Sequence, residues 1–155
     1  ADVTDSTFVD NRADGYDVDF SDGLIARNLF ERNGNDGIDC GTAHPAIRDN
    51  RVLNSGDKGI SIGERSRPAV EGNYIAHCNV GIAVKDGSQP ELRNNRFLSN
   101  AVAVSAYQKK KAFGGAQVTI HNSTFQGNAK VSEADGLSSV SLRNCRVDDD
   151  LAQQD

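Results

Sequence analysis

The chain repeats itself at intervals of about 22 residues, and this period limits what it can fold into more than any other feature. An apolar residue marks each repeat, and successive copies are 22 or 23 residues apart except for one interval of 28. A period of this length is typical of solenoids, in which each repeat is one coil that buries its apolar side only against its neighbours. The marker residues are Phe8, Phe30, Val52, Ile75, Phe97, Phe125 and Val147.

Asparagine recurs at fixed places relative to this marker. One column lies three residues after it and another two residues before it, shifting back by one residue in the last two repeats. Asparagine tolerates left-handed turns, and its amide can hydrogen-bond to an identical residue one rung away, so aligned asparagines favour stacked turns. The first column is Asn11, Asn33, Ser55, Cys78, Asn100, Asn128 and Asp150, and the second is Asn28, Asn50, Asn73, Asn95, Asn122 and Asn144.

Short alternating segments follow each marker, and most of them begin with glycine. Gly37-Ile-Asp-Cys and Gly59-Ile-Ser-Ile carry apolar residues at every second position, and a further strand such as Ala46-Ile-Arg opens each repeat. Gly, Asn and Pro turns separate these strands, and no long segment has the period of an amphipathic helix. The sequence therefore predicts an all-β, single-stranded parallel β-helix of about seven coils, with residues 1–155 forming one domain.

Charge and cysteine content argue against several classes of protein. The chain has 17 basic and 22 acidic side chains, a net charge of −5, and no visible basic stripe with interleaved aromatic residues. Nucleic acid is therefore not expected as a partner. No apolar run approaches the ~18 residues that span a bilayer. Cys40, Cys78 and Cys145 are widely spaced and odd in number, which predicts free, mostly buried thiols rather than disulfides or a zinc site.

The segment Ser88-Gln-Pro-Glu-Leu-Arg-Asn-Asn-Arg-Phe resembles the right-handed β-helix repeats of the pectate-lyase-like superfamily. Similar repeats occur in carbohydrate-binding and sugar-hydrolase modules and in copper-insertion accessory proteins. The resemblance covers essentially the whole chain and implies a right-handed parallel β-helix with a secreted or cell-envelope location. It does not choose a reaction, because this fold carries lyases, hydrolases, epimerases and inert scaffolds alike.

Alternation along the glycine-started strands assigns the apolar residues to the interior and the residues between them to the outer face. Asp17 and Asp39 then lie one rung apart, ~4.8 Å, and Asp19 lies beside Asp17. Lys58 supplies a cation opposite this pair, and small residues floor a shallow channel between the acidic and basic ends. The outward columns are Asp17, Asp39, Ser61, Ala83, Ser105 and Asp19, Gly41, Gly63, Lys85, Tyr107; the corner column is Asp14, Asp36, Lys58, Val80.

Three interpretations of this face stay open. Carboxylates at this spacing could act as acid and base on a glycosidic bond, which makes Asp17, Asp36, Asp39 and Lys58 the candidate catalytic residues. Asp17, Asp19 and Asp39 could instead hold a calcium ion through oxygen ligands; no other cofactor is expected. The third interpretation is a solvated face with lateral Asp–Lys pairs, each of which contributes little stability.

A second resemblance concerns the polygalacturonases of this fold, which carry Asn-Thr-Asp-Gly, Asp-Asp, Gly-His-Gly and Arg-Ile-Lys motifs on successive coils. This chain has Ala13-Asp-Gly-Tyr, Asn35-Asp-Gly-Ile, Asp57-Lys-Gly-Ile-Ser-Ile-Gly and Ala83-Val-Lys in the same order. By position, Asp14 and Asp36 match the catalytic acids and Lys85 the lysine that binds the substrate carboxylate. Lys58 stands where that family has histidine and Ala83 where it has arginine, which argues against membership.

A third resemblance is to the β-helix segments attached to bacterial spore-coat-H-like kinase-fold proteins. It rests on Asp36-Gly-Ile-Asp, Gly56-Asp-Lys-Gly-Ile-Ser-Ile-Gly-Glu, Ala83-Val-Lys-Asp and Tyr107-Gln-Lys-Lys-Lys. It implies an accessory domain of a larger, often cell-envelope protein and transfers no chemistry.

The 28-residue repeat contains an insertion at residues 107–115 that leaves the body beside Lys85. Tyr107 offers an aromatic platform for a sugar ring, and Lys109, Lys110 and Lys111 join Lys85 as candidate partners for uronate carboxylates. The alternative interpretation is a solvated loop with a glycine hinge.

The ends of a β-helix carry unpaired strand edges that need a cover. The charged segment 148–155 is expected to finish the C-terminal end. No capping helix is visible at the N-terminus, which predicts that further coils, another domain or a subunit covers that edge.

The leading functional hypothesis is a carbohydrate-active or carbohydrate-binding module for polysaccharide or oligosaccharide, acidic chains included. As an enzyme it would be a hydrolase, lyase or epimerase. The alternative is a non-catalytic scaffold or interaction domain of a larger protein.

Overall fold

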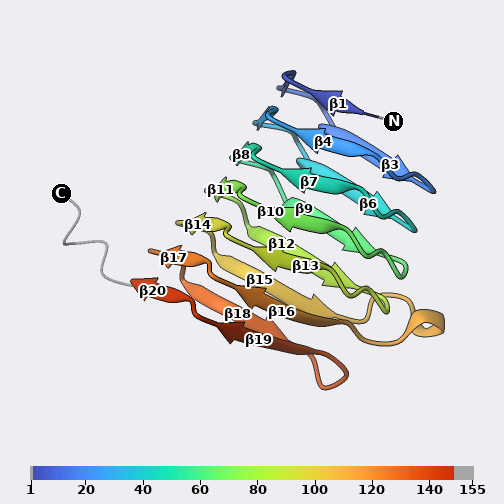
Figure 1. Ribbon diagram of the computed structural model, residues 1–155, viewed down its shortest axis with the longest axis vertical. Coiled ribbons are helices and arrows are strands. Elements are labelled where there is room, and N and C mark those ends of the chain that lie inside the picture. The colour runs from blue at the N-terminus through green and yellow to red at the C-terminus, as the bar shows by residue number, and fades with distance from the viewer. Residues whose placement is uncertain (1, 149–155) are drawn as a thin grey trace.

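The computed structural model describes residues 2–148, which form a solenoid of stacked coils with three parallel sheets (Figure 1). Sheet A contains β1 (Val3–Thr4), β4 (Leu24–Ala26), β7 (Ala46–Arg48), β10 (Ala69–Glu71), β13 (Glu91–Arg93), β16 (Gln117–His121) and β19 (Ser139–Arg143). Sheet B contains β2 (Thr7–Val9), β5 (Leu29–Glu31), β8 (Arg51–Leu53), β11 (Tyr74–Ala76), β14 (Arg96–Leu98), β17 (Thr124–Gln126) and β20 (Arg146–Asp148). Sheet C contains β3 (Tyr16–Asp19), β6 (Ile38–Gly41), β9 (Lys58–Gly63), β12 (Val80–Lys85), β15 (Val102–Tyr107) and β18 (Lys130–Ala134).

Each of the first six coils contributes one strand to each sheet, and the last described coil contributes strands to sheets A and B. Equivalent strands of successive coils pair in parallel. The sequence repeat sets this register: Phe8 pairs with Phe30, and Val52 pairs with both Phe30 and Ile75. The predicted parallel β-helix is therefore confirmed. The insertion at residues 107–115 adds the 3₁₀ turn η1 (Lys111–Phe113) and leaves the register of the neighbouring coils intact, because β15 and β16 still pair with their equivalents.

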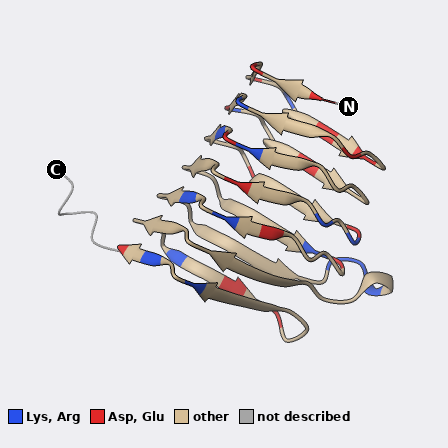
Figure 2. Ribbon diagram, in the orientation of Figure 1, with Lys and Arg blue, Asp and Glu red and all other residues tan. Residues whose placement is uncertain are grey.

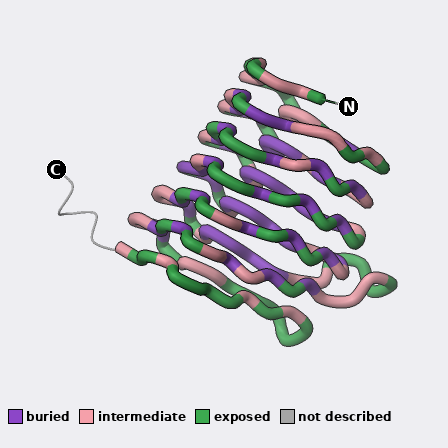
Figure 3. Tube along the Cα trace, viewed as in Figure 1, coloured by how far each residue is buried: buried purple, intermediate pink, exposed green. Residues whose placement is uncertain are grey.

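The core is a set of apolar columns that run along the solenoid axis. The marker residues from Phe30 to Phe125 are at most 1% exposed. The rings of Phe97 and Phe125 stack with centroids 4.9 Å apart and planes 4° apart. Burial fails in the last described coil, where Val147 is 45% exposed (Figure 3). Each coil thus owes its dry interior to a coil on either side.

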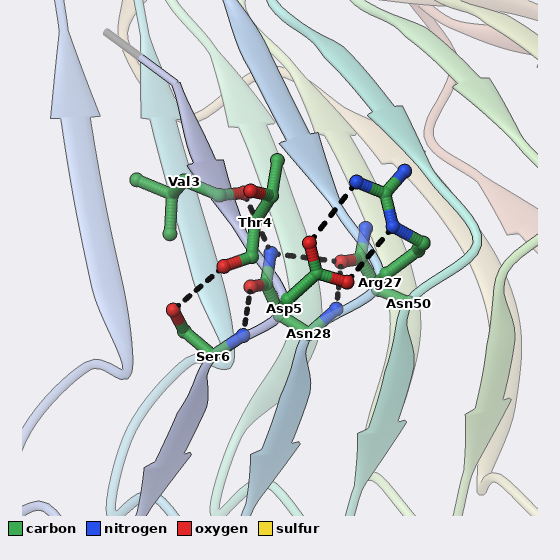
Figure 4. Close-up of polar contacts among 7 residues, drawn as sticks. All are labelled: Val3, Thr4, Asp5, Ser6, Arg27, Asn28 and Asn50. Carbon is green, nitrogen blue, oxygen red and sulfur yellow. Dashed lines mark hydrogen bonds and ion pairs between the residues drawn. The ribbon is translucent and has the colours of Figure 1, made fainter.

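A ladder of buried asparagines closes the corner between sheets A and B. The Nδ2 of Asn28 donates to the Val3 carbonyl (2.9 Å) and to Asn50 Oδ1 (3.1 Å), and Asn50 Oδ1 also accepts the Asn28 backbone N–H (Figure 4). Asn50 and Asn73 repeat this pattern, with Asn73 and Asn95 as their acceptors. Ser123 Oγ takes over at the next coil, accepting the Asn95 N–H.

The last two asparagines of the predicted column therefore lie outside this ladder. Asn122 and Asn144 instead occupy the preceding corner position, where φ is 50° and 52°. One residue per coil is left-handed at this position, and only Gly72 among them is a glycine. Asparagine tolerates this conformation at little cost, which explains the shift by one residue.

The structure of residues 2–148 also bears on the predictions about the cysteines, a membrane span and the two ends of the solenoid. Cys40 and Cys78 are buried free thiols and Cys145 is a half-buried one, as expected. None of the helical segments in this range could cross a bilayer. β1, β2 and β3 form the N-terminal edge of the three sheets, and a cover for that edge stays a prediction. Apart from Asp148, the segment 148–155 expected to finish the other end lies outside the described residues.

The ladder predicts a large penalty for removing one of its central members. Asn73→Ala would orphan the buried Ile47 carbonyl and the Asn50 N–H, which Asn73 satisfies at 2.9 and 3.0 Å. Each orphaned group costs about 1–3 kcal/mol, so we expect the free energy of unfolding to fall by about 3 kcal/mol or more. Urea unfolding measures this. Asn79→Ala, at an exposed asparagine, should cost less than about 1 kcal/mol, and equal losses in the two variants would contradict the ladder's role.

Candidate functional site

The outer face of sheet C carries the predicted polar rows in the predicted register. Asp17 pairs with Asp39, which pairs with Ser61, and Asp19 pairs with Gly41. Further along, Lys85 pairs with Tyr107. Acidic residues gather on the first two coils and basic residues in the loop that follows β15 (Figure 2). The parallel register thus brings together side chains that are far apart in the sequence.

Three carboxylates meet at the acidic end of this face. One oxygen each from Asp14, Asp17 and Asp39 lies within 4.8 Å of the others, and we call these residues the acidic cluster. Burial raises the pKa of Asp17, and repulsion from Asp19, Asp39 and Asp14 adds to that effect. Asp14, rather than the predicted Asp19, completes the group with oxygens close enough to share a cation.

Asp36 occupies the corner before β6 and bonds to the backbone of the next coil. Asp14 Oδ1 accepts the Asp36 N–H at 2.9 Å, and Asp36 Oδ1 accepts the Lys58 N–H at 3.1 Å. Asp36 is only 3% exposed, and this burial raises its pKa to about 6 against the attraction of Lys58. These two hydrogen bonds explain why an aspartate occupies this corner. A catalytic role for Asp36 stays a prediction.

Lys58 forms an ion pair with Asp57 and, among the described residues, none with the acidic cluster. Its Nζ donates to Asp57 Oδ2 at 2.6 Å. Burial opposes the charge of Lys58, but the bond to Asp57 and the nearby Asp36 carboxylate outweigh burial and raise the pKa. The expectation that Lys58 faces the Asp17–Asp39 pair is therefore corrected. Its flexible side chain reaches its sequence neighbour, a contact that strand register could not reveal.

Two glycines on the outer face make room for long side chains to lie flat. A Cβ at Gly41 would lie 2.5 Å from Asp19 Oδ1, and a Cβ at Gly63 would lie 3.4 Å from Lys85 Cε. Asp19 therefore leans over Gly41 and Lys85 over Gly63, so the two approach each other from opposite directions. Between them is a pocket of about 230 Å³, the lysine pocket, lined by Asp19, Asp39, Cys40, Gly41, Gly63, Glu64, Lys85, Asp86, Lys109 and Lys110.

The insertion at 107–115 forms one wall of the lysine pocket and is held against the body. Asp86 Oδ1 accepts the backbone N–H groups of Lys109 and Lys110, both at 2.7 Å. The Lys110 Nζ bonds to Glu64 Oε1 at 2.5 Å, and the guanidinium of Arg65 lies over the Phe113 ring, 5.3 Å from its centroid. Glu64 and Asp86 thus belong to the site, although the outward columns did not contain them.

Lys85 is the unusual charge in this pocket. It is half-buried and forms no ion pair with any residue in the range 2–148. Burial lowers its pKa; the attraction of Asp39 opposes this, while repulsion from Lys58 and Lys109 reinforces it. Lys109 likewise has no ion-pair partner among the described residues. Two unpaired ammonium groups beside a pocket are suited to an anionic ligand.

The remaining predicted residues divide between two places. Tyr107 lines a separate hollow of about 460 Å³ together with Asp57, Lys58, Ser105 and Glu133, among others. Burial raises the pKa of Tyr107, against the effect of Lys58. Lys111 lies exposed on η1 and lines neither hollow. The candidate sugar-binding residues of the insertion are therefore separated, with Lys109 and Lys110 at the lysine pocket and Tyr107 beside Lys58.

The comparison with protein families agrees with this architecture. The model of the right-handed β-helix region matches residues 1–150, so the chain belongs to the right-handed β-helix family. Searches of the curated proteins and of the solved structures found no match to this chain. Family membership settles the fold and its handedness, and supports a relation to carbohydrate-handling proteins only at the level of the superfamily.

The raised pKa of Asp36 predicts a pH-dependent contribution to stability. Its folded-state pKa of about 6 exceeds the ordinary 3.8, so the folded protein is destabilised as pH rises through this interval. Asp36→Asn should therefore be more stable than the wild type above about pH 6, by on the order of 2 kcal/mol after solvent screening. Urea unfolding at a series of pH values measures the difference, which should vanish near pH 4.

Asp57→Asn provides a control of opposite sign. Burial opposes ionisation of Asp57, but the bond from Lys58 prevails and lowers its pKa. This variant should be less stable than the wild type at neutral pH, and the loss should disappear in acid as the wild-type carboxyl protonates. A pH-independent difference for Asp36→Asn would contradict the assigned ionisation.

Proposed function

We propose that the outer face of sheet C binds acidic polysaccharide or oligosaccharide, with the lysine pocket as the point of recognition. The observation that carries this proposal is the half-buried, unpaired ammonium of Lys85, held over Gly63 beside the carboxylate of Asp39. A uronate carboxylate would bond to Lys85 and Lys109, and ring hydroxyls would donate to Asp19 and Asp39. Such an anion would offset the repulsion between the two lysines.

The acidic cluster adds a chemical capability to this binding face. Carboxyl groups about 5 Å apart are typical of retaining glycosidases, in which one carboxyl is a general acid and the other a nucleophile. The raised pKa of Asp17 suits the acid, because an acid must hold its proton near the working pH. Asp39, at the border of the cluster and the lysine pocket, would be the nucleophile or base.

Binding is the first test. Labelled oligogalacturonate should bind the wild type, and Lys85→Gln should weaken binding by about tenfold through loss of one charge-assisted contact. Lys130→Gln is the matched control, since it removes the same charge from an exposed residue of β18 that lines neither hollow. Fluorescence anisotropy gives both affinities. Equal affinities for the wild type and Lys85→Gln, or a preference for neutral oligosaccharides, would reject the lysine pocket as the recognition site.

Turnover is a separate test, because a binding module can use the same face without cleaving anything. If the chain is a hydrolase, the wild type releases new reducing ends from an acidic polysaccharide. Asp39→Asn should then abolish release while leaving the midpoint of thermal unfolding within a few degrees of the wild type. Binding without release would identify a carbohydrate-binding module, and neither activity would favour the scaffold alternative.

Calcium at the acidic cluster is a second proposal, supported by the three oxygens within 4.8 Å of one another. An ion bound only by the folded state raises the unfolding temperature by mass action. Calcium should therefore raise the wild-type midpoint, and Asp17→Asn should remove most of that rise. Asp10→Asn, which alters an exposed carboxylate paired with Arg32, is the control. A rise that is equal in both variants would place the ion elsewhere.

A further inference from the structure

Arginine pairs recur at the corner between sheets A and B in every second coil. Each pair consists of the last residue of a sheet A strand and the first residue of the following sheet B strand. The two residues between them form the corner, which gives the sequences Arg48-Asp-Asn-Arg, Arg93-Asn-Asn-Arg and Arg143-Asn-Cys-Arg. We call Arg48, Arg51, Arg93, Arg96, Arg143 and Arg146 the arginine ridge; Figure 2 shows blue segments recurring at this corner.

The register aligns these pairs in two straight rows. Arg51 and Arg96 both pair with Tyr74, which lies on the coil between them. In sheet A, Glu71 pairs with both Arg48 and Arg93, and His121 with both Arg93 and Arg143. Successive arginines in a row are therefore two rungs apart, about 9.6 Å. The expectation that no basic stripe exists is corrected, because its members are brought together only by coiling.

Most of the ridge has no partner of opposite charge. Among residues 2–148, Arg93 alone of the six forms an ion pair, a 3.6 Å contact with exposed Glu91. Arg27, at the same corner nearer the N-terminus, differs because Asp5 neutralises it at 2.9 Å (Figure 4). Five of the ridge arginines are exposed and Arg93 is half-buried. A chain with a net charge of −5 thus keeps, in its described part, five guanidinium groups without an ion pair along one edge, and one carboxylate, that of Glu71, lies in register between Arg48 and Arg93.

Tyr74 holds the middle of the ridge in place. The guanidinium carbons of Arg51 and Arg96 lie 5.1 and 5.2 Å from the centroid of its ring, within the range of cation–π contacts. A guanidinium stacked on a ring keeps its edge N–H donors available for anions. Proteins that bind single-stranded nucleic acid stack its bases on aromatic rings. The Tyr74 ring is not free for such stacking, because the guanidinium groups of Arg51 and Arg96 lie over it.

Polar hollows border the ridge on both sides. On sheet A a hollow of about 330 Å³ is lined by Glu91, Arg93, Gln117, Thr119, His121 and Ser139, among others. On sheet B a hollow of about 250 Å³ is lined by Arg96, Thr124, Gln126, Arg146 and Asp148, among others. Guanidinium groups in these hollows suit the anionic groups of a ligand, while the hydroxyl, amide and carboxylate groups that also line them suit its hydroxyls.

We infer that the arginine ridge is a second binding surface, and that its ligand is a linear anionic polysaccharide lying along the solenoid axis. An extended chain of sugars advances by about one rung per ring, so an anionic group on every second sugar would meet an arginine pair. Carboxylate and sulfate groups both match the forked guanidinium donors. This inference is independent of the lysine pocket, which lies on the outer face of sheet C.

Affinity measurements with the full chain and ridge variants test this inference. Heparin oligosaccharides supply sulfate and carboxylate groups, and oligogalacturonates supply carboxylates only. Arg51→Gln/Arg96→Gln should weaken binding of the preferred probe by at least about tenfold and lower the salt dependence of binding by roughly two counterions. Arg12→Gln/Arg67→Gln removes the same charge from exposed residues outside the ridge and should change affinity less than about twofold.

The outcomes separate this surface from the lysine pocket and from other ligands. In a Lys85→Gln background, which removes the contribution of the lysine pocket, Arg51→Gln/Arg96→Gln should still weaken binding by about tenfold. A loss confined to Lys85→Gln would overturn the ridge while supporting the pocket. Affinity should increase with chain length up to the span of the ridge. Equal losses of affinity in the two arginine double variants would show that binding depends on overall positive charge and not on the ridge. Tighter binding of an oligonucleotide of equal charge at physiological salt would overturn the assignment of the ligand as a polysaccharide.

Discussion

Every feature of this protein depends on one constraint: each coil must pair its backbone and bury its apolar column against the coil before and after it. A coil of about 22 residues has too little interior to fold alone. Stacking supplies the backbone hydrogen bonds, the continuous column of Phe, Val and Ile, and the asparagine ladder at the corner. The same stacking places any side chain directly beside its equivalent one rung away, and it is this repetition that creates the charged rows.

Stacking also brings charged side chains of successive coils close enough to affect one another. The carboxylates of Asp14, Asp17 and Asp39 are separated along the sequence, yet one rung brings them together. Burial raises the pKa of Asp17, and repulsion from its acidic neighbours adds to that effect. At the corner between sheets A and B, arginines occur in every second coil. They are spaced along a row and do not contact one another directly in register, because Tyr74 and Glu71 occupy the positions between them. The solenoid therefore carries a candidate site of mixed charge on sheet C and a basic edge between sheets A and B.

The sequence predicts the columns well and the side-chain directions poorly. The marker residues and the pairing of Asp17 with Asp39 follow from spacing alone, because the parallel register copies the repeat. The lysine pocket does not follow from spacing. It depends on Gly41 and Gly63 letting Asp19 and Lys85 lie along the sheet toward each other, and on Glu64 and Asp86 holding the insertion in place. Lys58 shows the same limit, since it bonds to Asp57 and not to the cluster across the face.

The sequence by itself determined the parallel β-helix, the number of its coils and the identity of its inward columns, because a repeat too small to fold alone has few ways to bury its apolar residues. The tertiary structure decided which polar side chains share a space. Ionic and hydrogen-bonded contacts depend on rotamers and on the path of the 107–115 insertion, neither of which a periodic pattern specifies. The arginine ridge lies between these cases: all of its residues can be read in the sequence, but only the register of the coils makes them neighbours.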